Sequence, residues 1–341
     1  MKAVVIEEYG KNLKVMDVET PRLSYGEILV RVRYCGICGT DLKIVSGKLR
    51  HIISLPHIPG HEIAGEVVEI GRGVKNIKPG DRGIIYLYLP CRDCELCRTG
   101  RENICYSVKR IGFELDGGFA EYVKVPEYNF CRIEDNSELW KMCILPDAVE
   151  TPYHALRTLL RPGPSEKLLI VGAGGLGLHA IQIAKLMGLF VAVVDVRSEA
   201  LEAAEKLGAD LVVNAGSYNP EKEITKWTDG KGVDFVIEGV GNEKTLSWSL
   251  HCLKRGGKLV VMGYDPVNPF SVKPLELHYN EWSIIGARLG TKQELLEVIQ
   301  MVENGKVAPM IAKIFPLNEI NRAIEELKSG LNVGRIVVEV R

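Results

Sequence analysis

The sequence lacks the features that would direct it to a membrane or to nucleic acid. No apolar run approaches the roughly 18 residues that a membrane-spanning helix requires. Charge of one sign is not in excess either, since 43 Lys and Arg residues face 44 Asp and Glu residues and the net charge is -1. A chain of this kind has no electrostatic footprint for nucleic acid or for an anionic membrane. We therefore expect a globular protein whose partner is a small molecule.

A secretory signal is also missing, because Met1 leads directly into a strand-like segment, MKAVVIEEYG. This pattern predicts a cytoplasmic protein. In a reducing compartment, the nine cysteines are better explained by metal binding or catalysis than by a disulfide framework.

The length of 341 residues predicts about two domains. Residues 1–150 read as mainly β, with many short strands separated by glycine and proline turns. A strand with one buried and one wet face is predicted where Ile28, Val30 and Val32 alternate with Leu29, Arg31 and Arg33. The pattern is typical of a barrel-like antiparallel domain.

After a loop near residue 163, apolar strands alternate with helical stretches, which predicts a parallel sheet covered on both faces. One predicted helix covers 198–207, with Ser198 as its N-cap. The last 50 or so residues carry two helices and end in a strand at 335–340. The fold class is therefore α/β, with a doubly wound parallel sheet beside the mainly β domain.

Four cysteines form the pattern C-x2-C-x2-C-x7-C, at Cys91, Cys94, Cys97 and Cys105. Zinc takes four tetrahedral ligands, and four thiolates close the site to water. The spacing therefore predicts a structural zinc, with an iron–sulfur cluster as the minor alternative.

A glycine-rich turn follows the apolar strand at 167–171 and opens a helix, with the pattern G-x-G-x-x-G at Gly172, Gly174 and Gly177. Together with Gly175 and Leu176, these residues predict a turn that brings a pyrophosphate close to a helix N-terminus. Asp195, at the end of the next strand, is placed to accept the ribose hydroxyls and so favours NAD. Arg197 softens that preference, and NADP stays an alternative cofactor.

Three further segments carry metal-ligand chemistry but lie far apart in the sequence: Cys38, His61 with Glu62, and Asp147. Thiolate, imidazole and carboxylate all suit zinc, and three protein ligands plus a water form the usual catalytic pattern. Spacing alone does not show that these residues meet at one metal.

A resemblance to a known family indicates that these residues do bind one metal ion. The motifs follow one another in the same order as in the zinc-containing medium-chain alcohol dehydrogenases, which the chain resembles from end to end. They are Gly36-Ile37-Cys38-Gly39-Thr40-Asp41, Pro59-Gly60-His61-Glu62, the four cysteines, Asp116-Gly117-Gly118-Phe119-Ala120-Glu121-Tyr122 and the glycine-rich turn.

The resemblance implies that Cys38 and His61 bind a catalytic zinc and that Glu62 is a nearby, sometimes coordinating, carboxylate. The family's third ligand is usually Cys or Glu, and counting back from Tyr153-His154-Ala155-Leu156 puts Asp147 at that position. Cys143 and Glu150 are the alternatives. A catalytic zinc and a structural zinc together give two Zn²⁺ per chain.

The same resemblance makes Thr40 the catalytic hydroxyl that bonds the substrate oxygen and starts the proton relay. Lys43 stands where many relatives continue the relay with a histidine, so the relay is expected to leave through ribose and water or through Lys43 itself. His51 and His57 read as surface-loop residues, with a place lining the cleft as the alternative. Arg335 matches an arginine that contacts the cofactor pyrophosphate in some relatives. Relatives form dimers and tetramers, so the expected assembly is a homodimer or homotetramer.

We therefore predict a discontinuous GroES-like catalytic domain at 1–150 and 290–341, and an NAD-binding Rossmann domain at 151–289. The predicted function is zinc-dependent hydride transfer between NAD(H) and an alcohol/carbonyl pair, with a secondary alcohol, polyol or sugar as substrate. The alternatives are an enoyl-type reductase of the same fold without a catalytic zinc, and a non-catalytic zinc- and nucleotide-binding protein.

Overall fold

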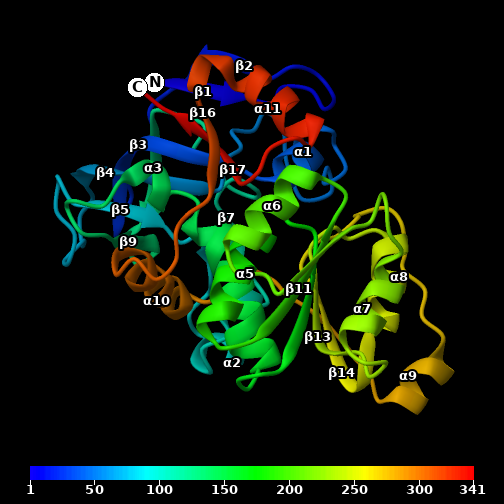
Figure 1. Cartoon of the computed structure of the whole chain (residues 1–341). Helices are drawn as coiled ribbons and strands as arrows, with labels where there is room; N and C mark the ends of the chain where they lie inside the picture. Colours follow the sequence, from blue (N-terminus) through cyan, green and yellow to red (C-terminus); the bar gives the residue numbers. More distant parts are fainter. The chain divides into compact units, whose positions relative to one another are not determined.

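A computed structural model describes all residues, 1–341, and divides the chain into two compact units (Figure 1). Unit 1 comprises residues 1–147, 291–305 and 311–341, and unit 2 comprises 148–290 and 306–310. The segment 306–310 thus joins unit 2, whereas the sequence analysis placed all of 290–341 in the first domain.

Unit 1 is built around a seven-stranded sheet that is antiparallel except for one pair. The main path runs β16-β17-β3-β4-β5-β9, β8 also pairs with β3, and β16 and β17 are parallel. These strands are β3 (Glu27–Ile37), β4 (Glu62–Ile70), β5 (Arg82–Ile85), β8 (Tyr122–Pro126), β9 (Phe130–Arg132), β16 (Ile311–Pro316) and β17 (Arg335–Glu339).

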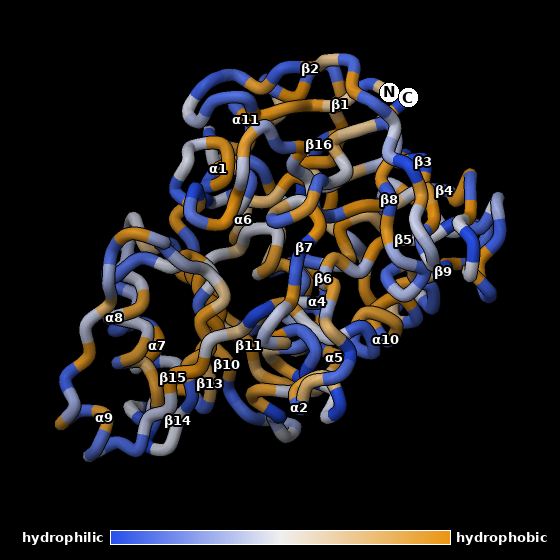
Figure 2. The backbone as a smooth tube through the Cα atoms, turned by 180° about the vertical axis from the view of Figure 1, so that it is seen from behind, coloured by the Kyte–Doolittle hydropathy of each residue, from blue (hydrophilic) through white to orange (hydrophobic).

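Two small antiparallel pairs complete the β structure of unit 1: β1 (Lys2–Val5) with β2 (Lys14–Asp17), and β6 (Tyr88–Leu89) with β7 (Lys109–Arg110). The two chain termini lie side by side in this unit (Figures 1 and 2). Its short α-helices are α1 (Gly39–Val45), α2 (Glu95–Arg98), α3 (Leu139–Met142), α10 (Lys292–Glu303) and α11 (Ile320–Ser329). Single turns of other helical types are η1 (Glu102–Ile104), η2 (Glu127–Asn129) and η5 (Leu317–Glu319), and the π-helical η3 (Leu145–Val149) begins in unit 1 and ends in unit 2.

The strand predicted from alternation at 28–33 is β3, but its two faces are not simply dry and wet. Arg31 and Arg33 are exposed as expected, whereas Leu29 is buried along with Ile28 and Val30. The prediction for Leu29 was wrong because alternation shows which residues share a face of the strand, but not whether another segment of the chain covers that face. Ile28, Val30 and Val32 contribute to the main core of unit 1, together with residues of α11 and β17.

Unit 2 contains a six-stranded, fully parallel sheet with the order β12-β11-β10-β13-β14-β15. Its strands are β10 (Lys167–Val171), β11 (Phe190–Asp195), β12 (Leu211–Asn214), β13 (Val233–Glu238), β14 (Leu253–Val261) and β15 (Ser283–Gly286). The helices are α4 (Glu150–His154), the π-helical η4 (Ala155–Leu160), α5 (Gly177–Leu186), α6 (Ser198–Lys206), α7 (Pro220–Trp227), α8 (Glu243–His251) and α9 (Pro274–Asn280).

Both faces of this sheet are covered, as a run of apolar residues without alternation predicts. Leu169 and Val171 of β10 pack with residues of α7 and α8, while Leu168 and Ile170 on the opposite face are also fully buried. Figure 2 shows the hydrophobic character of β10 and β13. The strand order reverses at β10, so the carboxyl ends of β10 and β13 form the edge where ligands bind in open α/β sheets.

Ser198 does not cap α6, contrary to the prediction. It is the first residue of that helix, and Arg197 occupies the N-cap position without a side-chain cap. The Asp195 carboxylate instead accepts the backbone N–H groups of Val196 and Arg197, which turns the chain into the helix.

None of the helices in the structure is long and apolar enough to cross a membrane.

Candidate functional site

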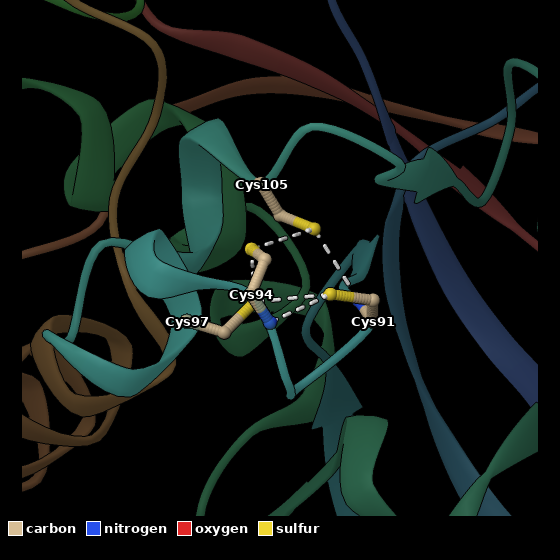
Figure 3. Close-up of side chains that lie close together, drawn as sticks. All are labelled: Cys91, Cys94, Cys97 and Cys105. Carbon is tan, nitrogen blue, oxygen red and sulfur yellow. Dashed lines mark hydrogen bonds between the residues drawn. The ribbon is translucent and has the colours of Figure 1, made fainter.

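The four predicted cysteines of unit 1 converge, with their sulfur atoms turned toward one another (Figure 3). Sulfur–sulfur distances are 3.8 Å for Cys91–Cys97, 3.5 Å for Cys94–Cys97 and 3.8 Å for Cys94–Cys105. A tetrahedral zinc with bonds of about 2.3 Å places its sulfur ligands about 3.8 Å apart. The four side chains therefore fit a zinc ion.

Backbone N–H groups make this cluster favourable for thiolates. The amides of Asp93 and Cys94 point to the Cys91 sulfur at 3.5 and 3.3 Å, and these bonds lower the pKa of Cys91 to about 6. Burial and the neighbouring thiols raise the pKa of Cys97 to about 12. Four thiols at this spacing cannot all ionise without a cation between them, because like charges this close repel strongly.

The scattered ligand set also comes together in unit 1. Ligand atoms of Cys38, His61, Glu62 and Asp147 all lie within 4.8 Å of one another, and all four residues are buried. The register of the sheet explains part of this, since Gly36 near the end of β3 pairs with Glu62 at the start of β4. Cys38 then caps α1, and Asp147 enters from η3.

The charges around this buried cluster favour a cation. Asp41 Oδ1 lies 3.5 Å from His61 Nδ1, and Asp147 Oδ2 lies 3.6 Å from His61 Nε2. Although burial acts to lower the pKa of His61, these carboxylates outweigh it and raise that pKa well above its usual range. Asp41 thus faces one ring nitrogen of His61, and Asp147 lies near the other, where the His61 and Asp147 side chains could ligate one metal ion.

Arg335 supplies the positive charge that faces the two carboxylates of the set. Its guanidinium bonds Glu62 Oε1 through Nε at 2.9 Å and Asp147 Oδ2 through Nη2 at 2.5 Å. Burial acts to raise the pKa of Asp147, but Arg335 and His61 hold it well below its usual range. Burial raises the pKa of Glu62 to about 8 against the opposing charge of Arg335.

Three polar atoms in this cluster are buried without a hydrogen-bond partner: Asp41 Oδ1, His61 Nδ1 and Glu62 Oε2. Orphaned buried polar atoms are rare and costly in folded proteins. Asp41 Oδ1 and His61 Nδ1 face each other at 3.5 Å, beyond hydrogen-bond distance, so only Glu62 Oε2 has no polar partner at all. The fit to zinc rests on the donor set itself, which combines a thiol, an imidazole and two carboxylates.

Asp147, rather than either alternative, supplies the fourth side chain of this set. Cys143 is buried in unit 1, where its thiol points to the Trp140 carbonyl at 3.3 Å. Glu150 belongs to unit 2, in α4, where its side chain lies against the backbone of Gly290. Neither residue contributes an atom to the cluster.

Thr40 lies beside the ligand set, on the first turn of α1. Its hydroxyl is 3.6 Å from the Cys38 sulfur, and the residue is half-buried.

His51 is exposed, as predicted. His57 is not a surface residue: it is buried, with Nε2 3.1 Å from the Gly112 carbonyl oxygen, because its backbone pairs with Ile6 of the core.

The glycine-rich turn connects β10 to α5 in unit 2. Gly172 has a φ of +94°, and a Cβ on Gly177 would lie 1.9 Å from the Gly172 carbonyl oxygen. Both positions therefore require glycine for the chain to fold. Gly174 is different, since a Cβ there would meet nothing within 4 Å. Its open side is space that a ligand can use.

Asp195 ties the end of β11 to this turn. One carboxylate oxygen accepts the Ala173 N–H at 2.8 Å, and the Arg197 guanidinium binds both oxygens at 3.0 Å. Burial opposes ionisation, but the bonds from Arg197 lower the pKa of Asp195. The carboxylate is therefore a fixed negative charge beside the turn.

Sequence reasoning missed one residue of these sites, Asp41, and the partners of another, Arg335. Asp41 was read only as part of a motif, although a Cys-x-x-Asp spacing at a helix start indicates a capping box, and Asp41 does accept the Cys38 N–H. The pairing of Arg335 with Glu62 and Asp147 left no local signal, because it joins residues 273 and 188 positions apart.

Comparisons with known proteins agree with this architecture. Residues 24–135 match a family model described as an alcohol dehydrogenase GroES-like domain, and residues 175–304 match one described as a zinc-binding dehydrogenase.

Full-length relatives are similar as well. An NAD-dependent alcohol dehydrogenase of Sulfolobus acidocaldarius is 39% identical, with 100% of both chains covered. An alcohol dehydrogenase of Geobacillus stearothermophilus is 39% identical over 100% of this chain and 99% of its own. The crystal structure of the alcohol dehydrogenase from Aeropyrum pernix superposes with a TM-score of 0.95 at 33% identity, covering 99% of this chain and 100% of that one.

Proposed function

Because the chain belongs to the zinc-containing medium-chain alcohol dehydrogenases, which are NAD-dependent oxidoreductases acting on alcohols, we propose that Cys38, His61 and Asp147 hold its catalytic zinc. The observation that supports this most is the convergence of one thiol, one imidazole and two carboxylates, all buried, from three separate segments. We further propose that Cys91, Cys94, Cys97 and Cys105 hold a second, structural zinc, which gives two per chain.

A zinc ion in the buried site supplies a Lewis acid that makes an alcohol proton easier to remove. The residues of the chain then have distinct tasks. Thr40 accepts the substrate proton at its hydroxyl oxygen and passes its own proton outward, since a hydroxyl can do both. Arg335 holds Glu62 by Oε1, while Oε2 lies buried against Gly36 without a hydrogen-bond partner. Glu62 is thus a carboxylate that Arg335 fixes beside the proposed zinc ligands.

We assign the cofactor site to the turn at Gly172, Gly174, Gly175, Leu176 and Gly177, at the carboxyl end of β10. Asp195 and Arg197 lie beside it. The Asp195 charge disfavours a 2′-phosphate, so NAD is the proposed cofactor. Arg335 as a pyrophosphate contact stays a prediction, and its guanidinium is engaged by two carboxylates of unit 1.

Gly174→Ala tests this assignment without disturbing the fold, because the added methyl meets open space in the protein. We expect NADH affinity to fall at least about tenfold, since a methyl group occupies the room where the pyrophosphate approaches the backbone. Fluorescence titration of NADH on the zinc-loaded protein measures this. Unchanged affinity would remove the turn from the cofactor site.

The substrate class that we propose is a secondary alcohol, a polyol or a sugar. A carboxylate at the third-ligand position, Asp147, favours the polyol and the sugar, whereas family members with a thiolate there take simple secondary alcohols. An NAD-coupled assay over simple alcohols, polyols and aldoses tests both the reaction and the class. Failure to oxidise any member with either nicotinamide cofactor would overturn the proposed function.

We also propose a homodimer or homotetramer in the cytoplasm. The edge strand β15 has one free side, and the large apolar side chains of Leu275, Tyr279 and Ile284 are exposed in and near it. An unprotected edge of this kind is usually covered by a partner. All nine cysteines are free thiols, which suits a reducing compartment. Light scattering on the purified protein gives the assembly directly, and a monomer would refute this part.

A further inference from the structure

One fully buried histidine of unit 2 has no role in the function described so far. His179 lies in α5, one turn after the glycine-rich turn, and its side chain is 0% exposed. Its Nδ1 is 2.6 Å from the Gly175 carbonyl oxygen, and its Nε2 is 2.9 Å from the Met310 backbone nitrogen.

These two contacts determine which ring nitrogen carries the proton. A backbone N–H can only donate, so Nε2 must be the acceptor from Met310. In a neutral imidazole the other nitrogen then bears the hydrogen, and Nδ1–H donates to Gly175. His179 is therefore a neutral residue with a single tautomer, bonded at both ends.

The bond to Gly175 orients a peptide group of the cofactor turn. A trans peptide is planar, with its C=O and N–H pointing in opposite directions. Holding the Gly175 carbonyl toward His179 therefore directs the Leu176 N–H away from the helix body. Leu176 occupies the N-cap position of α5, where backbone N–H groups have no partner inside the helix. Such amides are the groups that bind phosphate oxygens.

The imidazole ring is also held from its other side. The segment 306–310 lies along α5, where Gln182 exchanges two hydrogen bonds with the backbone of Ala308, at 2.9 and 2.8 Å. Gln182 is three residues after His179, so both side chains lie on one face of the helix. The Met310 bond fixes the ring so that Nδ1 cannot turn away from Gly175.

We propose that His179 is a positioning residue for NAD binding: through Nδ1–H it holds the Gly175–Leu176 peptide so that the Leu176 N–H faces the cofactor pyrophosphate. The inference rests on the proposed function of the glycine-rich turn. Its effect belongs to cofactor affinity and not to zinc binding.

Two substitutions distinguish the hydrogen bond made by Nδ1 from the one made by Nε2. In His179→Asn the amide nitrogen lies near the position of Nδ1 and keeps a donor for Gly175. In His179→Gln the amide group reaches the position of Nε2 and keeps an acceptor for Met310. We expect the NADH dissociation constant to rise about five- to tenfold in H179Q and to stay within about threefold in H179N. Zinc content should be unchanged in both.

Titration of the zinc-loaded protein with NADH, followed by fluorescence, gives these constants. Equal affinities in H179Q and the wild type, with only a lower melting temperature, would mean that His179 is merely structural. A loss in H179N but not in H179Q would assign the effect to Met310. Either result overturns the proposal. Gln182→Ala is the matched control, because it removes two bonds to the segment 306–310 and none to the turn.

A measurement on the unaltered protein keeps the proposal testable if a variant does not fold. With ¹⁵N-labelled histidine, the NMR spectrum should show the His179 proton on Nδ1, and NADH should shift that signal. A proton on Nε2, or a signal that NADH leaves unmoved, would contradict the proposal.

Gly174→Ala separates this inference from the function on which it rests. If G174A weakens NADH binding and H179Q does not, only the role of His179 fails. If neither variant weakens binding, the turn is not the cofactor site and the proposed function fails with it.

Discussion

The two metal-ligand clusters of unit 1 are assembled in different ways. Cys91, Cys94, Cys97 and Cys105 come from one short loop, and their exposure ranges from exposed to buried. Cys38, His61, Glu62 and Asp147 come from three distant segments, and every one of them is buried. The first set needs little more than a local turn, whereas the second needs β3, β4 and η3 in their final places.

This difference indicates that the four-cysteine cluster serves stability and the buried cluster serves catalysis. Four thiolates fill the coordination sphere of zinc, so the loop cluster can hold a segment of chain but offers no position to a substrate. The buried cluster has carboxylates on one side, Arg335 behind them and Thr40 beside Cys38. It combines ligands with a group that can move a proton. Variants of the two clusters should therefore affect different observables.

The largest effect is expected for Asp147→Ala. Removing this carboxylate takes away one ligand and leaves Arg335 without one of its two partners. We expect kcat/KM for alcohol oxidation to fall by about a thousandfold or more, since a weakly held metal cannot stabilise the alkoxide. Steady-state assays with NAD and added zinc measure this. Asp147→Cys, which restores an anionic ligand, should recover part of the activity.

Full activity in D147A at normal zinc content would remove Asp147 from the catalytic site. The contrast between the two clusters would then need a different third ligand.

The next effect concerns stability. Cys94→Ser should abolish zinc binding in the loop cluster and destabilise the protein by several kcal/mol, because metal binding to such a site contributes directly to folding. Thermal unfolding with and without a chelator measures the loss. Cys252→Ala is the control: this buried cysteine lies in unit 2, outside both clusters, and its loss should leave the effect of the chelator unchanged.

If C94S unfolds like the wild type and the chelator has no effect on either protein, the loop cluster is not a structural metal site.

A smaller effect on stability is expected for Arg335, which pairs with the carboxylates of the buried cluster. Arg335→Met leaves Glu62 and Asp147 without their shared cation, and breaking a buried ion pair costs about 3–5 kcal/mol. Zinc in the buried cluster offsets part of this cost, so the loss should be greater in the zinc-free protein than in the zinc-loaded protein. Denaturant unfolding of both forms tests the difference. Equal losses in the two forms would indicate that Arg335 and the metal act independently.

The smallest effect is chemical and appears only without metal. At pH 7 a thiol with a pKa of about 6 is mostly thiolate, whereas the usual cysteine is only a few per cent ionised. Cys91 in the zinc-free protein should therefore react with iodoacetamide at least about tenfold faster than Cys97, whose pKa is raised. Peptide mass spectrometry gives the rates. Equal labelling of the two thiols, or labelling that zinc does not prevent, would contradict the assigned geometry.

The sequence allowed the local features to be predicted and left the long-range ones open. The loop cluster followed from its spacing, and the glycine-rich turn followed from a strand before it and a helix after it. The buried cluster could not be derived from spacing, because its members meet only through the pairing of β3 with β4 and the position of η3. There the family resemblance provided the expectation.

The wrong predictions have the same origin. Leu29 and His57 are buried by segments that their own neighbours in the sequence do not reveal. Ser198 is not the N-cap because α6 begins at Ser198 itself, after a turn in which Asp195 binds the amides of Val196 and Arg197. These outcomes depend on contacts that a local pattern does not contain.

The most direct test of the account is the number of zinc ions that each chain retains after dialysis without chelator. We predict two per chain in the wild type, one in Asp147→Ala and one in Cys94→Ser, with alcohol oxidation lost only in the first variant. A wild type that holds one zinc, or a D147A variant that holds two, would contradict the division into a structural and a catalytic metal site.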